Sequence, residues 1–347
     1  MDNHGTSRAS YLAAREVSRK NFLRIGGAGL AGVALLGVAG CGGASGGSGE
    51  DYPSQPVEYV IPFDPGGESD TTARLQQGPL EEALGGTSVT VSNQPGGGGS
   101  LGWSELVNST EPDGYTIMGH NLPHIILQPL TRDDAGYETD ALKQVYIFES
   151  TPNALIVSGD SSYNTVEDFI AAAQEEPGSI SIGGSGEFTS NHVATLQLAQ
   201  QNDVELQYVP FTGTGSATSG LQSGQVDALM TYNTAAPDLQ EQGAKVLAVA
   251  AEERAQNLPD VPTFEEEGYE LSEAAYRGVA VPPETPDNIV NTLADAFREI
   301  NNDPEVIQQM EDLGFTIENM GPQEAEQFTQ ERMDENRQLL QELGLIE

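Results

Sequence analysis

A glycine-bearing turn offers the clearest group of potential ligand contacts in this sequence. The apolar segment VEYVI is followed by PFDPGGESD at residues 62–70, which leads into a helical pattern. Two adjacent glycines between a strand and a helix let main-chain N–H groups face a cavity, where the helix dipole also favours negative charge. Such a turn favours the capture of a small anion over chemistry on it. The candidate ligand contacts here are Phe63, Pro65, Gly66, Gly67, Glu68 and Asp70.

The side chains of this turn have a second role open to them, because the start of a helix needs a cap. We expect Gly66, Gly67 and Glu68 to present main-chain donors, and Ser69 or Asp70 to cap the helix. For Asp70, capping is our first interpretation and ligand contact is the alternative. Donors a few ångströms from an anion outweigh distant, salt-screened charges, so peptide groups can hold an anion even in an acidic protein.

A second candidate cradle is GSGEFTSNH at residues 184–192, which again follows an apolar segment and precedes an amphipathic one. It supplies hydroxyl donors and an asparagine in the first helical turn, while His192 either contacts the ligand or orients the loop. Two cradles on separate lobes can hold the two ends of a dicarboxylate, and closure between them would exclude water. The candidates in this turn and in a third one further on are Ser185, Gly186, Thr189, Ser190, Asn191, His192, Gly213 and Thr214.

Two strand ends supply further candidates. His120 and Asn121 follow the apolar segment YTIMG and could contact the middle of a ligand. Tyr232 and Asn233 follow DALMT, where ligand contact and ordinary hydrogen bonding within a loop are both open. Phe63 could add an aromatic wall, although core packing is the alternative for such a residue.

Short apolar segments alternate with helical patterns along the chain, which is too long for one comfortable core and suggests two domains. This alternation predicts parallel, doubly wound sheets that bind ligands beyond the carboxyl ends of their strands. The segment from residue 286 onward should pack back onto the first sheet, which makes the second domain an insertion. The expected strands are 57–62, 88–92, 115–119, 144–148, 154–158, 179–183, 205–209, 226–231, 245–251 and 278–281, and the expected helices are 70–84, 101–108, 165–174, 190–201, 216–222, 286–301, 304–313 and 322–343.

The N-terminal region has the pattern of an export signal. Basic residues precede an apolar stretch at residues 25–39, which is shorter than the roughly 20 residues that span a membrane. Small residues then precede Cys41, the single cysteine, and a Gly/Ser-rich spacer follows. Because this is similar to a bacterial lipoprotein box, we expect residues 1–41 to be an export signal with a lipidated Cys41 and residues 42–51 to be a linker. A single cysteine allows no internal disulfide.

The charge balance excludes several classes of partner. Residues 1–40 hold five of the 14 Lys and Arg but two of the 53 Asp and Glu, so the remaining chain carries a net charge of about −42. Such a protein repels nucleic acid and anionic lipid surfaces. The acids are interleaved with apolar residues, which is typical of folded proteins from very salty surroundings, where the Debye length falls to about 3 Å. The sequence therefore predicts a halophilic protein that does not bind nucleic acid.

Several segments occur in the order and spacing of one known family, over about 290 residues. The sequence resembles the TctC solute receptors, also called Bug proteins, of tripartite tricarboxylate transporters. It departs from them where NQPGGGGS replaces NRPGAGGN and FTGT replaces YKGG, and the loss of a basic residue at both places leaves the ligand open. The segments that carry the resemblance are YPSQPVEYVIPFDPGGESDTTAR, NQPGGGGSLG, EPDGYTI, GGSGEFTSNH through YVPFTGTGSA, SGQVDALM, LPDVPTFEEEGY and GVAVPPETP.

The resemblance implies an α/β, two-lobed fold like that of type II periplasmic binding proteins, a Venus flytrap of two doubly wound sheets with a ligand cleft between them. We place lobe 1 at residues 52–150 and 278–347 and lobe 2 at residues 151–277. The implied function is reversible binding of a mono-, di- or tricarboxylate outside the cytoplasmic membrane and its delivery to permease subunits. We expect a monomer, held at the membrane by its lipid anchor, without cofactor or metal.

Enzymatic function is not favoured by these residues. The sequence has no Cys/His metal cluster and no H-E-x-x-H pattern, and no histidine is paired with a nucleophile elbow. We therefore predict no catalytic residue, with a hydrolase as one alternative. The other alternative is a surface ligand-sensing module that does not take part in transport.

Overall fold

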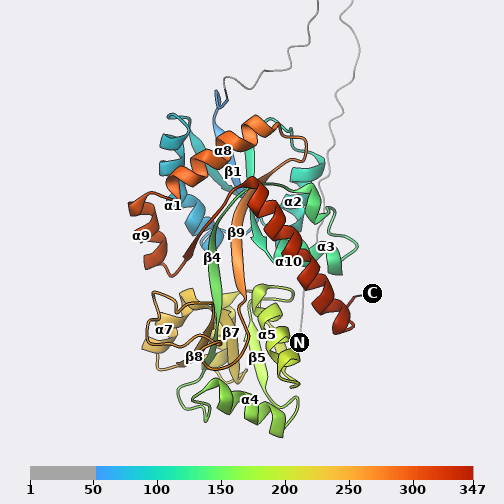
Figure 1. Cartoon of the computed structure of the whole chain (residues 1–347), viewed down its shortest axis with the longest axis vertical. Helices are drawn as coiled ribbons and strands as arrows, with labels where there is room; N and C mark the ends of the chain where they lie inside the picture. Colours follow the sequence, from blue (N-terminus) through green and yellow to red (C-terminus); the bar gives the residue numbers. More distant parts are fainter. Residues whose placement is uncertain (1–51, 347) are drawn as a thin grey trace, which may run out of the picture. The chain divides into compact units, whose positions relative to one another are not determined.

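The computed structural model describes residues 52–346, which form a ten-stranded mixed sheet with helices packed on it (Figure 1). Cys41, the export signal and the linker lie outside the described residues. The strands are β1 (Val57–Ile61), β2 (Val89–Asn93), β3 (Thr116–Leu122), β4 (Lys143–Val157), β5 (Ser181–Gly184), β6 (Gln207–Pro210), β7 (Ala228–Tyr232), β8 (Lys245–Ala250), β9 (Ala274–Val281) and β10 (Thr316–Met320). The α-helices are α1 (Glu68–Ala83), α2 (Ser100–Asn108), α3 (His124–Thr131), α4 (Val166–Glu175), α5 (Ser190–Gln201), α6 (Thr214–Gln222), α7 (Ala236–Glu241), α8 (Asp287–Ile300), α9 (Pro304–Asp312) and α10 (Pro322–Glu342).

Two long strands connect the two parts of the sheet. The order is β2-β1-β3-β9-β4-β7-β5-β6, and β8 and β10 also pair with β4. Strands β1, β2 and β3 are parallel, and so are β5, β6 and β7. Strands β4 and β9 run antiparallel to each other and pass side by side between the two parts (Figure 1). We call the part with β1–β3 and β10 lobe 1 and the part with β5–β8 lobe 2.

Each lobe buries apolar side chains on both faces of its sheet. In lobe 1, Tyr59 packs with Phe297 of α8, while the next residue, Val60, packs with Trp103 of α2. Successive residues of a strand point to opposite faces, so this division is expected. In lobe 2, β4 contacts α4 on one face and α7 on the other. Phe297 and Trp103 are fully buried, and burial of one such side chain contributes about 1.5–3 kcal/mol.

The predicted two-lobed α/β fold is confirmed, but the predicted strand directions need correction. We expected wholly parallel sheets, whereas β9 is antiparallel to both β3 and β4. The segments 144–148 and 154–158, expected as two strands, are one strand, β4. Its middle carries buried polar residues from Glu149 to Asn153, and this break in the apolar pattern is what we took for a loop. The exact lobe bounds stay a prediction, because β4 and β9 contribute to both lobes.

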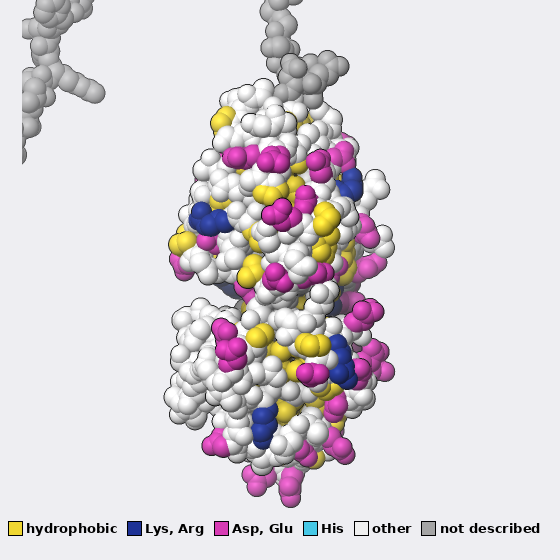
Figure 2. Space-filling model, turned by 90° about the vertical axis from the view of Figure 1, so that its left-hand side faces the viewer, with side chains coloured by type: hydrophobic (Ala, Val, Ile, Leu, Met, Phe, Trp, Pro, Cys, Tyr) yellow, Lys and Arg dark blue, Asp and Glu magenta, His cyan; other side chains and the backbone are white. Residues whose placement is uncertain are grey.

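The acidic residues of the described part lie among other side chains over the surface. Figure 2 shows one face on which Asp and Glu are spread over both lobes and Lys and Arg are few. Such spacing keeps like charges apart, which limits their mutual repulsion. Within residues 52–346, no helix combines the length and the apolar character needed to cross a bilayer.

Candidate functional site

The topology brings the candidate turns of both lobes to one junction. In lobe 1, the carboxyl end of β3 pairs with the start of β9, where Asn121 lies opposite Arg277. In lobe 2, the carboxyl end of β7 pairs with the middle of β4, where Tyr232 lies opposite Asn153. Since Arg277 also lies opposite Glu149 of β4, the carboxyl edges of both parallel sheets meet near the middle of β4. Ligands of α/β proteins bind at such edges, so we place the candidate site here.

The first turn is held by its own aspartate. The Gly66 amide donates to Asp70 Oδ2 at 2.9 Å, and Asp70 also pairs with Arg74 at 2.8 Å. The hydrogen bond from Arg74 lowers the pKa of Asp70, so this carboxyl stays ionised. Asp70 therefore binds within the protein, but it does not cap α1 as we expected, because the N-cap residue is Gly67 and no side chain caps it. The prediction that the Gly66 N–H is open to a ligand needs correction, because Asp70 accepts it.

The remaining donors of the first turn lie at the N-terminus of α1. The first main-chain hydrogen bond of this helix is donated by Thr71 to Gly67 O, so the amides of Glu68, Ser69 and Asp70 precede the bonded part of the helix. The Ser69 hydroxyl donates to Asn121 Oδ1 at 3.2 Å, which places the end of β3 beside this turn. Pro65, Gly66 and Gly67 are exposed in the same turn, and Phe63 is half-buried. Phe63 packs edge-on against Trp103, as a core residue does.

His120 does not join the turn. Its ring is buried beside Gly278 of β9, where a Cβ on Gly278 would lie 2.8 Å from it. Burial lowers the pKa of His120 to about 4, and the neighbouring Gln144 opposes this shift. His120 and Asn121 point to opposite sides of β3, so only Asn121 reaches the first turn. Contact of His120 with a ligand at this junction is therefore corrected to a place in the lobe 1 interior.

The second turn is also preorganised by its own side chains. Asn191 Oδ1 accepts hydrogen bonds from Ser185 N at 3.0 Å and Ser185 Oγ at 2.5 Å, and Asn191 Nδ2 donates to Asn153 Oδ1 of β4 at 2.6 Å. The Thr189 hydroxyl donates to Gly186 O at 3.0 Å. These side chains shape the loop, and their polar atoms are occupied by protein partners.

His192 helps to orient the second turn. Its Nδ1 accepts a hydrogen bond from the Phe188 amide at 3.1 Å. Its ring stacks on Tyr208 with 4.2 Å between centroids, and the Tyr208 hydroxyl donates to Gly186 O at 2.7 Å. Burial lowers the pKa of His192 to about 4, so the ring is neutral and Nδ1 can accept. Of the two roles left open by the sequence, the structure favours loop orientation.

Ser190 stands apart from its neighbours in the second turn. Its side chain is fully buried, and Ser190 Oγ makes no well-formed hydrogen bond among residues 52–346, although it lies close enough to the Tyr232 hydroxyl to oppose the raising of the pKa of that group by burial. The first main-chain bond of α5 runs from Val193 N to Thr189 O, so the amide of Ser190 belongs to the open N-terminal turn. An unpaired buried hydroxyl costs free energy, and a ligand that accepts its hydrogen bond would recover that cost.

The third turn lies beside the second one. The Phe211 amide donates to Gly184 O at 2.9 Å, so the strand ends of β5 and β6 are joined just before both turns. Gly213 precedes α6, and Ala217 N donates to Gly213 O at 3.1 Å. The amide of Thr214 therefore precedes the bonded part of this helix, as in the other two turns.

The two residues after β7 have different roles. Asn233 Nδ2 donates to Gly314 O at 2.8 Å and to Asn257 Oδ1 at 3.1 Å, so Asn233 contacts lobe 1, which favours the second of its two open roles, hydrogen bonding within the protein. Tyr232 is buried, and its ring lies 5.8 Å from the guanidinium of Arg277. Burial and then the Glu68 carboxylate raise the pKa of Tyr232, while the hydroxyls of Ser190 and Ser185 oppose this shift. Tyr232 thus lies between the two turns.

Sequence reasoning missed Arg277 and Glu149, which occupy the junction itself. Arg277 is 3% exposed, pairs with Glu68 of the first turn and lies 3.6 Å from Glu149 Oε1. Glu149 is fully buried, and its carboxylate accepts a hydrogen bond from the Thr72 hydroxyl of α1 at 2.9 Å. A lone arginine inside the apolar segment AAYRGVAV was the available signal for Arg277. For Glu149 the available signal was a charge between two apolar segments, which we read as a loop.

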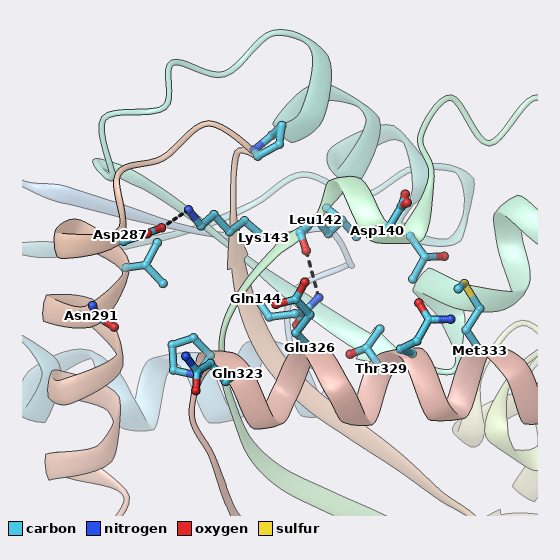
Figure 3. A pocket seen from close by; sticks show the side chains of 15 residues that line it. Asp140, Leu142, Lys143, Gln144, Asp287, Asn291, Gln323, Glu326, Thr329 and Met333 are labelled. Carbon is cyan, nitrogen blue, oxygen red and sulfur yellow. Dashed lines mark hydrogen bonds and ion pairs between the residues drawn. The ribbon is translucent and has the colours of Figure 1, made fainter.

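Two cavities lie away from the facing turns. One, of about 480 Å³, lies in lobe 1 between the start of β4, α8 and α10, with Lys143, Gln144 and Thr329 in its wall (Figure 3). The other, of about 590 Å³, is lined by Asn233 and Tyr276, among others. Residues 52–346 contain no cluster of three or more His, Cys, Asp or Glu arranged to hold a metal ion.

Comparison with known proteins agrees with this fold. Residues 72–345 match the tripartite tricarboxylate transporter family receptor, TctC. A UPF0065 protein in the tcbD-tcbE intergenic region of Pseudomonas sp. (strain P51) is 31% identical over 278 residues, which are 78% of this chain and 81% of that relative. The solved structure of MatC from Rhodopseudomonas palustris with bound malate is 27% identical, with a TM-score of 0.72 over 83% of this chain and 100% of that one. The solved structure of the periplasmic binding protein BugD is 26% identical, with a TM-score of 0.72 over 85% of this chain and 99% of that one.

The fold and the facing turns define a two-lobed solute-binding protein. The chain belongs to the TctC receptor family of tripartite tricarboxylate transporters, which confirms the resemblance seen in the sequence. The family and its structural neighbours are solute-binding receptors, so the enzyme alternative is set aside.

The buried Glu149 carboxyl gives a first prediction. Burial raises its pKa from 4.5 to about 8 against the opposing effect of Arg277, so the folded protein keeps a proton that the unfolded chain loses in this range. The stabilisation that comes from this retained proton is complete below the pKa of Glu149 in the unfolded chain, and it is lost as the pH rises towards 8. Glu149→Gln keeps the neutral form, so its free energy of unfolding should rise relative to the parent protein, by up to about 1.4 kcal/mol per pH unit.

Urea unfolding from about pH 5 to about pH 8 measures this difference. Glu187→Gln is the matched control, because Glu187 is exposed and its replacement should leave the pH profile unchanged. Parallel stability profiles for Glu149→Gln and the parent protein would show that Glu149 is ionised throughout this range.

Proposed function

We propose that this receptor binds a small carboxylate between the N-termini of α1 and α5 and delivers it to a membrane permease. The observation that carries the proposal is that helix N-termini from both lobes present open first-turn amides at one junction, together with the unpaired hydroxyl of Ser190. Helix N-termini attract anions through their N–H groups and their dipoles. The malate bound to MatC supports the same chemical class of ligand for a related receptor.

The geometry supports binding without a chemical step. The donors at the junction are main-chain amides and a hydroxyl, and burial lowers the pKa values of His120, His124 and His192 to about 4. Hydrogen bonds to a charged group contribute about 1.5–3 kcal/mol each, so three or four suffice for micromolar binding after the cost of ordering the ligand. In this proposal Gly67, Glu68, Asp70, Ser190 and Thr214 supply amides, while Ser185, Gly186, Thr189, Asn191 and His192 hold the second turn in shape.

The cellular setting is part of the proposal. The sequence pattern at Cys41 supports export and a lipid anchor at the outer face of the cytoplasmic membrane, and family membership supports permease subunits as the partner. The acidic surface supports a monomeric protein that works in concentrated salt. A sensing module without a permease is the second candidate. Uptake of the ligand by vesicles that carry the permease subunits, when this receptor is added, would favour transport over sensing.

A thermal-shift screen of mono-, di- and tricarboxylates in concentrated salt tests the central proposal. A ligand at 100 times its dissociation constant stabilises the folded protein by about 2.7 kcal/mol, which shifts the melting temperature by several degrees. Malate is the first compound to test. If no carboxylate shifts the melting temperature while a cation or neutral solute does, the proposal is wrong.

Gly67→Leu should abolish this binding and leave the fold intact. The residue has φ −79°, and a Cβ there would lie 3.7 Å from Asp64 O, so the backbone accepts a side chain that covers the first-turn amides of α1. Gly78→Leu is the control, because Gly78 is exposed in the same helix and a Cβ there meets no atom within 4 Å. Isothermal titration with malate gives the affinities, and undiminished binding by Gly67→Leu would remove the first turn from the site.

Ser190→Ala should weaken carboxylate binding about tenfold or more without loss of stability. The substitution removes an unpaired buried hydroxyl from the free protein and a hydrogen bond to a charged group from the complex. Ser219→Ala in α6 is the control, since Ser219 is exposed and its hydroxyl bonds within the helix to Gly215 O. Equal affinities of the Ser190→Ala protein and the parent would place the ligand elsewhere.

Cys41→Ser tests the anchor. The variant should appear in the soluble extract of cells, whereas the parent protein should sediment with membranes and partition into detergent. Membrane association that persists in Cys41→Ser cells would exclude lipidation at this residue.

A further inference from the structure

Glu68 has contacts that a solvated helix-start carboxylate would not make. It is the first residue of α1, and its side chain is only 25% exposed. One carboxylate oxygen pairs with Arg277 of β9, and the other accepts a hydrogen bond from the Thr234 hydroxyl of lobe 2 at 2.5 Å. Glu68 therefore fills the place beside Arg277 with a carboxylate that belongs to the protein.

Arg277 keeps capacity for a further acceptor. Its guanidinium lies 5.8 Å from the rings of both Tyr232 and Phe315 and also donates to the Thr151 hydroxyl. Its Nε–H is buried without a partner among residues 52–346. Arginine presents its N–H groups as a planar fork that matches a carboxylate, so this is a preformed anion-binding group at the junction.

The two facing turns place a bound anion next to this pair. The amide of Glu68 belongs to the open N-terminus of α1, so an anion held there lies close to the Glu68 carboxylate. Across the junction, Arg277 contacts Tyr232, whose pKa is influenced by the hydroxyls of Ser185 and Ser190 in the second turn. Two negative groups beside one guanidinium oppose each other.

Of the two carboxyl groups near Arg277, Glu68 is the one in direct contact with the guanidinium. The second carboxyl near the guanidinium, Glu149, lies 3.6 Å away and has its pKa raised to about 8 by burial. When another carboxylate approaches Arg277, either Glu68 leaves the guanidinium or the guanidinium binds both carboxylates.

We propose that Glu68 is an internal competitor of the ligand: its carboxylate occupies Arg277 in the empty receptor, and a carboxylate of the ligand takes its place. This inference rests on the proposed carboxylate binding and adds the residues that set its affinity and charge preference. Because the Glu68 carboxylate must leave Arg277 before a ligand can bind there, only ligands with an ionised group compete well. If Glu68 stays near the ligand, each further carboxylate on the ligand is repelled by Glu68.

Glu68→Gln tests this competition. The variant keeps the shape of the side chain and a hydrogen bond to Thr234 but frees Arg277, so its affinity for malate should rise about tenfold, within the usual range of coupling between two competing contacts. The gain should be larger for a tricarboxylate than for a monocarboxylate. Glu187→Gln is the matched control, because it removes the same charge from an exposed position in the second turn without freeing Arg277. Isothermal titration at one fixed salt concentration gives all affinities.

The outcomes are distinguishable. If Glu68 only ties the lobes together, Glu68→Gln lowers the melting temperature and leaves the affinity equal to that of Glu187→Gln, which overturns the inference while carboxylate binding stands. If the gain persists in Glu68→Gln/Arg277→Gln, Arg277 is not the ligand's partner and the inference is also wrong. If neither the parent protein nor any variant binds a carboxylate, the proposed function fails together with the inference.

Discussion

The guanidinium of Arg277 lies where both lobes meet, and its charge has to be neutralised in an interior that excludes most water. Breaking a buried ion pair by removing one partner costs about 3–5 kcal/mol, so the residues around Arg277 are constrained as a group. Glu68 comes from lobe 1, Tyr232 from lobe 2, and Glu149 and Thr151 from the strand that joins them. Any change in the relative position of the lobes must therefore preserve or replace the partners of this one cation.

The junction offers donors to the proposed anion although the protein carries a strongly negative charge. The acidic residues are spread over the surface (Figure 2), where dissolved salt screens their charge. At the junction the donors are peptide groups and a buried arginine, which act over hydrogen-bond distances in a medium of lower dielectric constant. Local geometry thus decides the sign of the potential that a small ligand meets.

The sequence predicted the elements that glycines and apolar periodicity define. The turns at residues 62–70 and 184–192 lie between strand and helix as expected, and α1 and α5 begin within two residues of the predicted starts. The sequence did not predict β4 as one strand, because its central polar residues are buried by partners from other elements rather than by an apolar pattern. The sequence also did not show that Asp70 accepts the Gly66 amide. It could not show that Glu68 reaches Arg277, because more than 200 residues separate the two in the chain.

Strand β4 sets the separation of the two turns through a pair of side-chain contacts. Glu149 accepts a hydrogen bond from Thr72 of α1, and Asn153 accepts one from Asn191 of α5. These two positions are four residues apart, which corresponds to about 13 Å along an extended strand. The two helices that begin at the facing turns are thus attached to one strand. The polar residues that interrupt the apolar pattern of β4 are therefore also the ones that hold α1 and α5 at the junction.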